Sequence, residues 1–390
     1  MSNDLPSTPA RPIRLTRLFP LVLLWNGGYK GARVVNTLFA LQLGASPFEI
    51  GLLLATYGLF ALVVAMRAGR FTDRYGVRMP VIGGVFACGA GILLPFFWPT
   101  LPAIFASAAV SGTGFIFVQV GLQTLTGSLA SGPARTRNIN LYALVVSMAD
   151  FLGPVVAGFA IEHTGYAPSY LYLTALSALA LIGFVVIGRH FPAGAGRSVT
   201  TANQRMTDLL RVPDLRRIFI ASAVVMTGLD LFQLYMPLYG HNAGLSPSAI
   251  GLVLGAFAVA GFVTRAIMPY IVGRMGEERT LMWSILCAAV TFPLIPFFEN
   301  AYALGAISFA VGLGMALGQP LTVILAYNYS PRGRAGETIG LRIAINNSMH
   351  VVVPTAFGGL GSIVGIGPVF WLSAAVLGVG AVLTRRQVAT

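Results

Sequence analysis

Two stretches of the 390-residue chain, Gly44–Leu54 (GASPFEIGLLL) and Gly244–Leu254 (GLSPSAIGLVL), decide its fold. They lie 200 residues apart and share Gly, Ser, Pro, Ile, Gly and two Leu at corresponding positions. The same spacing aligns further pairs: Arg74 with Arg274, Gly76 with Gly276, Gly112 with Gly312, Gly114 with Gly314, Gln119 with Gln319, Pro154 with Pro354, Gly158 with Gly358, Gly165 with Gly365 and Pro168 with Pro368. Chance similarity among apolar segments would match Leu and Val, but it would not keep Gly, Pro and Gln in one register. The chain is therefore predicted to contain two copies of one unit.

The composition around these stretches indicates a membrane protein. Hydrophobic residues make up 56% of the chain and charged residues 9%, whereas soluble domains average about 45–50% apolar and about 25% charged residues. The formal net charge of +13 would by itself fit a nucleic-acid binder. The positions of the charges, described below, argue against that interpretation.

Each copy holds six apolar runs long enough to span a bilayer, which needs about 20 residues per helix. Because backbone polar groups in hydrocarbon must be satisfied within their own segment, such runs should be helical. We therefore expect an all-α membrane protein with twelve transmembrane helices in two six-helix halves, 1–188 and 217–390, joined by a cytoplasmic linker, 189–216. The runs are 18–43, 48–68, 80–99, 102–130, 139–162, 167–188, 218–240, 247–268, 281–298, 303–328, 342–362 and 368–384.

The positions of Lys and Arg predict the orientation. The odd-numbered connections between the runs contain no Lys or Arg, and 23 of the 25 cations are assigned to the opposite side. Basic connections stay on the cytoplasmic side, so both termini are expected in the cytoplasm and the protein in the inner membrane. The net charge then reflects contact with the lipid bilayer rather than with nucleic acid. The two remaining cations, Lys30 and Arg33, lie inside the first run.

Six spans return the chain to its starting side, so the two halves are parallel repeats related by an axis along the membrane normal. Such an arrangement favours alternating access, in which a site between the repeats near the bilayer midplane is exposed to each side in turn. We therefore expect a transporter for a small molecule.

The segment Gly69–Arg78 (GRFTDRYGVR), which follows the second run, resembles the signature loop of the major facilitator superfamily. The resemblance implies the twelve-helix fold over essentially the whole chain. It also implies a gating role for the motif residues, in which Asp73 ties the second span to the N-terminal end of the eleventh, near Arg342. The second copy has Gly273 where the aspartate would stand, so the latch is expected on one side only. The gating residues are Gly69, Asp73, Arg74, Gly76, Arg78 and Arg342.

A second segment, Gly153–Gly158 (GPVVAG) in the fifth run, looks like the core of a motif found in twelve-span proton-coupled antiporters that export drugs and metabolites. Export by proton antiport is the function that this resemblance implies. The alternative is that the segment only packs helices together through small residues and a proline kink.

Five ionisable residues lie not near the ends of predicted spans but in the middle, where such residues are costly and usually functional. They are Lys30, Arg33, Asp150, Asp230 and His350. The repeat register places Lys30 opposite Asp230 and Asp150 opposite His350. Two pairings remain open: Lys30 or Arg33 with Asp150 and His350 with Asp230 inside each half, or Lys30 with Asp230 across the halves.

These residues suggest how substrate and protons are handled. Asp150, Asp230 and His350 are candidates for proton coupling, because His changes charge near neutral pH and burial favours the neutral carboxyl group. Lys30 and Arg33 would attract an anionic substrate, and permanent structural ion pairs are the alternative for all five. The candidate substrate-binding residues also include polar side chains in the lining spans: Asn26, Tyr29, Gln119, Gln123, Gln233 and Gln319.

Other chemistry finds little support in the sequence. No His or Cys cluster has metal-ligand spacing and no phosphate-binding loop is present, so we expect no metal, no cofactor and no enzymatic activity. The expected partners are a small-molecule substrate, protons and lipid, with the chain acting as a monomer. Export by antiport is the leading hypothesis, proton-coupled uptake of an organic anion is the second, and a membrane sensor without transport is the third.

Overall fold

A computed structural model describes residues 15–128, 132–191, 206–331 and 335–384. Within these ranges the chain is helical and contains no strand. The first half comprises α1 (Leu15–Gln42), α2 (Pro47–Tyr75), α3 (Arg78–Phe97), α4 (Leu101–Ser128), α5 (Gly132–Thr164), α6 (Tyr166–Ile187) and the short η1 (Gly188–His190). The second half comprises η2 (Met206–Arg211), α7 (Pro213–Asn242), α8 (Pro247–Met275), α9 (Glu277–Thr291), η3 (Phe292–Phe297), α10 (Ala301–Ala316), α11 (Gly318–Asn328), α12 (Ala335–Val364) and α13 (Ile366–Thr384).

The predicted twelve-helix fold is confirmed, with one refinement in the tenth span. That span is broken at Leu317 into α10 and α11, so the eleventh and twelfth spans are α12 and α13. Nine helical segments of the described chain are long and apolar enough to cross a membrane by length and composition. The other three long helices, α1, α2 and α12, carry charged residues. Most of the predicted linker, residues 192–205, lies outside the described part of the chain.

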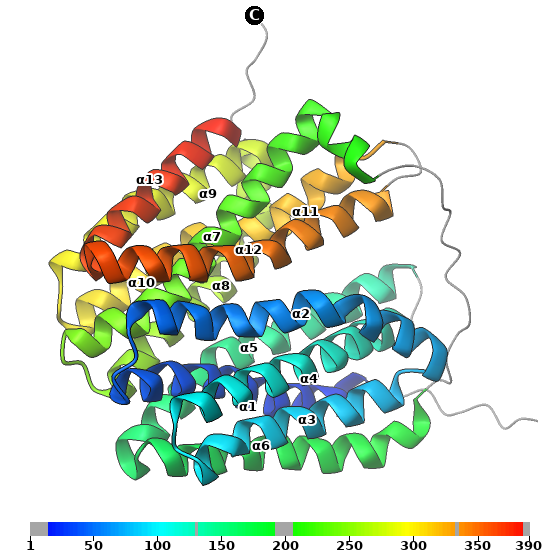
Figure 1. The fold of residues 1–390 in the computed structure, drawn as a ribbon. Coiled ribbons are helices and arrows are strands. Elements are labelled where there is room, and N and C mark those ends of the chain that lie inside the picture. The colour runs from blue at the N-terminus through cyan, green and yellow to red at the C-terminus, as the bar shows by residue number, and fades with distance from the viewer. Residues whose placement is uncertain (1–14, 129–131, 192–205, 332–334, 385–390) are drawn as a thin grey trace, which may run out of the picture.

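The helices form two bundles that face each other across the middle of the molecule. In Figure 1, α1 to α6 lie together below and the helices from α7 onward lie together above. The two bundles contact each other mainly where α2 packs against α12 and where α5 packs against α8. These two contacts correspond under the 200-residue register.

The two repeated stretches form the turns that start α2 and α8. Gly44 and Gly244 have positive φ values of 83° and 75°, a conformation that glycine adopts without strain. Ser46 and Ser246 then cap the helices by accepting a hydrogen bond from the backbone N–H three residues later. We name the end of the bundle that carries these turns the turn end, and the opposite end, where α2 and α8 finish, the arginine end.

Small residues bring the two halves into close contact near the turn end. A Cβ atom added at Gly251 would lie 2.5 Å from the carbonyl oxygen of Pro154, and one at Gly51 would overlap the carbonyl oxygen of Pro354. Gly158, from the segment that resembles the antiporter motif, packs in the same way against Pro247. The predicted alternative role of that segment, helix packing through small residues, is therefore present in the structure.

Two hydrogen bonds reinforce this contact. The backbone N–H of Phe48 donates to Ser362 Oγ at 3.0 Å, and that of Ser248 donates to Glu162 Oε2 at 3.1 Å. The two bonds are related by the register, and in each one half caps the first turn of a helix in the other half. The halves are thus joined at the turn end.

A buried polar cluster holds the first half together. Asn36, which is fully buried, donates to the hydroxyl of Tyr57 at 2.6 Å and to Ser107 Oγ at 3.4 Å, and accepts from the hydroxyl of Tyr170 at 2.7 Å. These bonds link α1 to α2, α4 and α6. At the corresponding positions of the second half the chain has Met236, Phe257 and Phe370 in place of Asn36, Tyr57 and Tyr170. The second half therefore fills the same place with apolar side chains.

This difference yields a stability prediction. Asn36→Met should destabilise the protein by about 1–3 kcal/mol, because it removes the amide that the buried hydroxyl groups of Tyr57 and Tyr170 bind. Adding Tyr57→Phe and Tyr170→Phe should restore most of that loss, because removing both members of a buried hydrogen bond is close to neutral. Thermal unfolding of the purified protein measures both effects. A triple variant less stable than Asn36→Met would contradict this account.

Candidate functional site

Two adjoining cavities lie at the centre of the molecule, and we refer to them together as the chamber. The first, of about 280 Å³, lies between the halves, and the second, of about 420 Å³, lies mainly within the first half. Lys30 and Arg265 line both cavities and mark their junction. The second cavity follows α4 from Phe115 to Thr126, towards the arginine end. The chamber is thus closed off at the turn end and extends away from it.

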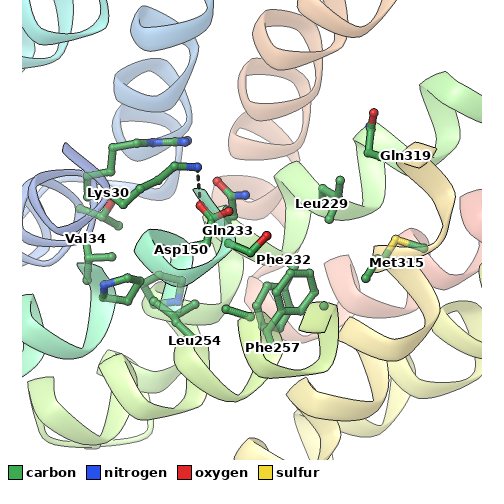
Figure 2. Close-up of a pocket in the computed structure, with 18 of the residues that line it drawn as sticks. Lys30, Val34, Asp150, Leu229, Phe232, Gln233, Leu254, Phe257, Met315 and Gln319 are labelled. Atoms are coloured by element: carbon green, nitrogen blue, oxygen red, sulfur yellow. Dashed lines mark hydrogen bonds and ion pairs between the residues drawn. The ribbon is translucent and has the colours of Figure 1, made fainter. Parts of the chain in front are cut away.

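Lys30 and Asp150 form an ion pair in the wall of the first cavity, with Nζ 2.7 Å from Oδ1 (Figure 2). The pair depends on close packing of α1 against α5: a Cβ atom added at Gly153 would lie 2.9 Å from the carbonyl oxygen of Gly27 and from the backbone nitrogen of Gly31. Both side chains are partly exposed to the chamber, at 22% and 39%. Solvent or a ligand can therefore reach both charges.

Asp230 and His350 form the corresponding pair in the second half. His350 Nδ1 lies 2.8 Å from Asp230 Oδ1 and 2.9 Å from Oδ2, which joins α7 to α12. The side chain of Asp230 is 5% exposed and that of His350 is 37% exposed. The carboxyl group of this pair is therefore buried, whereas the imidazole is partly exposed.

Of the two pairings left open by the sequence, the structure contains the one within each half. Each half holds one acid and one base in contact, and the register exchanges their positions, so that the base lies on α1 in the first half and on α12 in the second. The two pairs differ in burial and in position: Asp150 is 39% exposed and Asp230 is 5% exposed, and of the four only Lys30 and Asp150 are among the residues that line the two cavities. The functional roles of the four residues remain predictions.

Two further cations reach the chamber, and neither lies within 4.0 Å of a carboxylate oxygen among the described side chains, although Asp150 interacts with Arg265 electrostatically from further away. The guanidinium of Arg33 lies over the ring of Tyr57, 5.3 Å from its centroid. Arg265 donates from Nη1 to the carbonyl oxygen of Ala143 at 3.1 Å and to Ser147 Oγ, both on α5. Among the described residues that line the chamber, three cations thus face the single carboxylate of Asp150.

The position of Arg265 corrects the sequence analysis, which counted this residue with the basic side of the membrane. The apolar run ends at 268, but α8 continues to Met275. Arg265 therefore lies ten residues from the end of the helix, about 15 Å along its axis. The repeat could have drawn attention to this residue. The corresponding position in the first half is Ala65, so the arginine is a departure from the repeat within an apolar run.

Arg342 lies deeper in the second half than its position at the start of the eleventh apolar run suggested. It is 5% exposed and its guanidinium donates to Gln319 Oε1, with Nη2 at 3.2 Å. Its Nε is buried without a hydrogen-bond partner among the described residues. Gln319 in turn lines the first cavity, so Arg342 adds a positive charge behind the chamber wall.

Most of the other predicted binding residues face the chamber. Gln233 and Gln319 line the first cavity, and Asn26, Gln119 and Gln123 line the second. Tyr29 differs, because it is buried at 4% exposure in the first half and stacks on Phe115, with centroids 4.3 Å apart.

The predicted gating motif is only partly described. Gly69 and Asp73 lie in α2, but the side chain of Asp73 falls outside the described part of the chain, so the latch stays a prediction. Gly76 ends α2 with a positive φ of 78°, as Gly276 does for α8, which explains a glycine at this position. Arg74 is exposed beside the ring of Tyr75, and Arg78 begins α3.

Two pseudo-symmetric helical halves around a central, largely apolar chamber with a few charged side chains define the class of multi-pass membrane transporters. Comparison with known proteins then gives the family. The sequence model of the Major Facilitator Superfamily matches residues 19–298 and 218–388, and the chain belongs to this superfamily. The superfamily consists of transporters of small molecules rather than enzymes.

Relatives and solved structures agree with this assignment. The chain is 22% identical to the quinolone resistance protein NorA of Staphylococcus aureus strain MRSA252 over 89% of each chain. It is 20% identical to multidrug resistance protein 1 of Bacillus subtilis strain 168 over 88% of each chain. Its fold matches the crystal structure of a POT family transporter in complex with a thioalcohol-conjugated peptide, with a TM-score of 0.81, 13% identity and 94% of each chain covered.

Proposed function

We propose that the protein is a proton-coupled transporter that exports small organic anions by alternating access. The observation that carries the substrate class is the charge of the chamber, where Lys30, Arg33 and Arg265 face only Asp150 among the described lining residues. Charges in a largely apolar cavity interact strongly, so an excess of cations selects a negatively charged ligand. The names of the two bacterial relatives, which are resistance proteins, support export.

The closed turn end fits one state of such a cycle. With the expected orientation, the turn end faces away from the cytoplasm and the chamber is accessible from the cytoplasmic side. An exporter binds its substrate in this state. The halves would then separate at the turn end and meet at the arginine end, where the predicted latch residue Asp73 lies.

Uptake by symport is the second candidate, and the contact between Lys30 and Asp150 favours it. An anion that binds Lys30 competes with Asp150 for the same cation. A proton taken up with the anion would then neutralise the displaced carboxylate in place of the lysine. Anion and proton would in that case bind together and cross together.

Transport by reconstituted protein separates the two directions. Benzenesulfonate is a suitable probe because it stays ionised across the relevant pH range. As an anion, it crosses a lipid bilayer only slowly without a transporter. In proteoliposomes with an acidic lumen, protons flow out and an antiporter moves the probe in. In proteoliposomes with an alkaline lumen, protons flow in and a symporter carries the probe with them. Both results hold whichever way the protein is inserted. We expect accumulation in the acidic lumen. Accumulation of benzylammonium in place of benzenesulfonate would contradict an anionic substrate.

A further inference from the structure

One face of α8 combines an aromatic ring, an open space and a cation at four-residue spacing. Phe257, Gly261 and Arg265 all line the first cavity and lie at positions i, i+4 and i+8, which place them along one side of a helix. We name these three residues the α8 binding face. Successive members are separated by about 6 Å along the helix axis. This spacing matches the size of a single aromatic ring.

Gly261 leaves room above the middle of this face. A Cβ atom added there would meet only Ala316, at 3.9 Å, which is ordinary van der Waals contact. At Gly251 and Gly312, by contrast, an added Cβ atom would lie 2.5 Å from a carbonyl oxygen of a neighbouring helix. Because Gly261 also lines the first cavity, the space over it belongs to that cavity rather than to a helix-packing contact.

The far end of the face is apolar and aromatic. The ring of Phe257 stacks on that of Phe232 from α7, with centroids 4.3 Å apart and planes 19° from parallel. Figure 2 shows these two rings on one side of the cavity, with Lys30, Asp150 and Gln233 grouped beside them. Aromatic ligands gain from offset or edge contacts with such rings beyond what burial alone supplies.

The near end of the face carries an available positive charge. The two hydrogen bonds of Arg265 both come from Nη1, and their acceptors, Ser147 and the carbonyl oxygen of Ala143, are uncharged. A guanidinium has five N–H donors, so donors on Nη2 and Nε remain for a ligand. Lys30 contacts Asp150, one turn further along α5 from Ser147, which brings its ammonium group to the same wall.

On the basis of the anionic substrate proposed above, we propose that the chamber recognises aryl anions in one orientation. The anionic group binds Arg265 beside Lys30, and the ring occupies the space over Gly261 in contact with Phe257 and Phe232. Arg265 comes from the second half and Lys30 from the first, so one ligand group contacts both halves. Aryl carboxylates and aryl sulfonates are the chemical classes that fit this arrangement.

Binding measured by titration calorimetry on the full chain in lipid nanodiscs tests the proposal. Three probes of similar size separate the contributions: benzenesulfonate, cyclohexanesulfonate without the aromatic ring, and benzenesulfonamide without the charge. The wild-type protein should bind benzenesulfonate about threefold to tenfold more tightly than cyclohexanesulfonate. Phe257→Leu should remove this difference, while Phe86→Leu, at an exposed position on α3, should keep it.

Two further variants test the cation that binds the anionic group, Arg265, and the space for the ring over Gly261. Arg265→Gln should weaken benzenesulfonate binding by about tenfold or more and leave benzenesulfonamide binding unchanged. The matched control is Arg274→Gln, an exposed arginine on the same helix beside the ring of Tyr270. Gly261→Val should block the ring of either aryl probe, with Gly83→Val on α3 as control, because nothing lies within 4 Å of a Cβ atom there.

The possible outcomes distinguish failure of the aryl-anion site from failure of the proposed anion transport. Equal affinity for benzenesulfonate and cyclohexanesulfonate in the wild-type protein, or equal behaviour of Arg265→Gln and Arg274→Gln, would overturn the oriented aryl site and leave an anion transporter intact. Tighter binding of benzylammonium than of benzenesulfonate would overturn the anionic substrate itself. Wild-type protein that binds none of these compounds would overturn both.

Discussion

Asp230→Asn is expected to abolish accumulation of benzenesulfonate driven by a pH gradient while leaving exchange of the probe at equal pH. Asp230 is buried and both of its carboxylate oxygens contact the imidazole of His350. The neutral amide keeps the shape of the side chain but cannot hold or release a proton. His350 on α12 would then lose its charged partner on α7, so a change in its charge could no longer affect the contact between the two helices. Transport without coupling is the result expected of a proton site that does not itself bind substrate.

Asp214→Asn is the matched control for this prediction. Asp214 lies at the start of the same helix, α7, and pairs with Arg217 at 3.4 Å in a partly exposed ion pair. Such pairs contribute little to stability, so the control should keep both exchange and coupling. Full coupling in Asp230→Asn would remove Asp230 from the proposed role. Loss of exchange together with a lower unfolding temperature would indicate that the pair with His350 is structural.

The repeat in the sequence predicted the parts of this molecule that depend on local backbone geometry. Gly44, Gly76 and their counterparts need positive φ values, and Ser46 and Ser246 cap helices, so these residues recur at the same spacing wherever the same turn recurs. The exchanged acids and bases at Lys30, Asp150, Asp230 and His350 followed from the same register. Their pairing did not, because spacing along a chain does not give the distance between helices.

The hydropathy pattern predicted the positions of polar side chains along the spans less well than the repeat predicted the turns. An apolar run marks the part of a helix that can cross the hydrocarbon rather than the whole helix, and α8 and α12 extend beyond their runs. Arg265 and Arg342 were therefore placed too close to the membrane surface. The Asn36 cluster was missed for a related reason: a single amide in an apolar helix gives no sign of its partners, which lie 21 to 134 residues away.

Gly51→Val is expected to slow transport strongly by hindering closure of the turn end. Any side chain at this position would overlap the carbonyl oxygen of Pro354 and the Cα atom of Gly358 on α12, so the halves would have to separate there. Backbone atoms cannot yield as a flexible side chain can. The equilibrium between the two access states should therefore shift towards the one that is open at the turn end, and exchange of benzenesulfonate should fall about tenfold or more, which corresponds to an energy difference of about 1.4 kcal/mol.

Labelling of Gln233→Cys in a Cys287→Ser background reports the access state directly, because position 233 lines the chamber. A membrane-impermeant maleimide presented on the turn-end side should react slowly in the otherwise wild-type protein and rapidly in Gly51→Val. Gly251→Val should behave in the same way, since Gly251 makes the corresponding contact with Pro154. Gly83→Val, which has open space around the new side chain, should leave labelling and exchange unchanged. If Gly51→Val exchanged the probe and reacted with the maleimide as the wild-type protein does, closure at the turn end would not depend on the approach of α2 to α12.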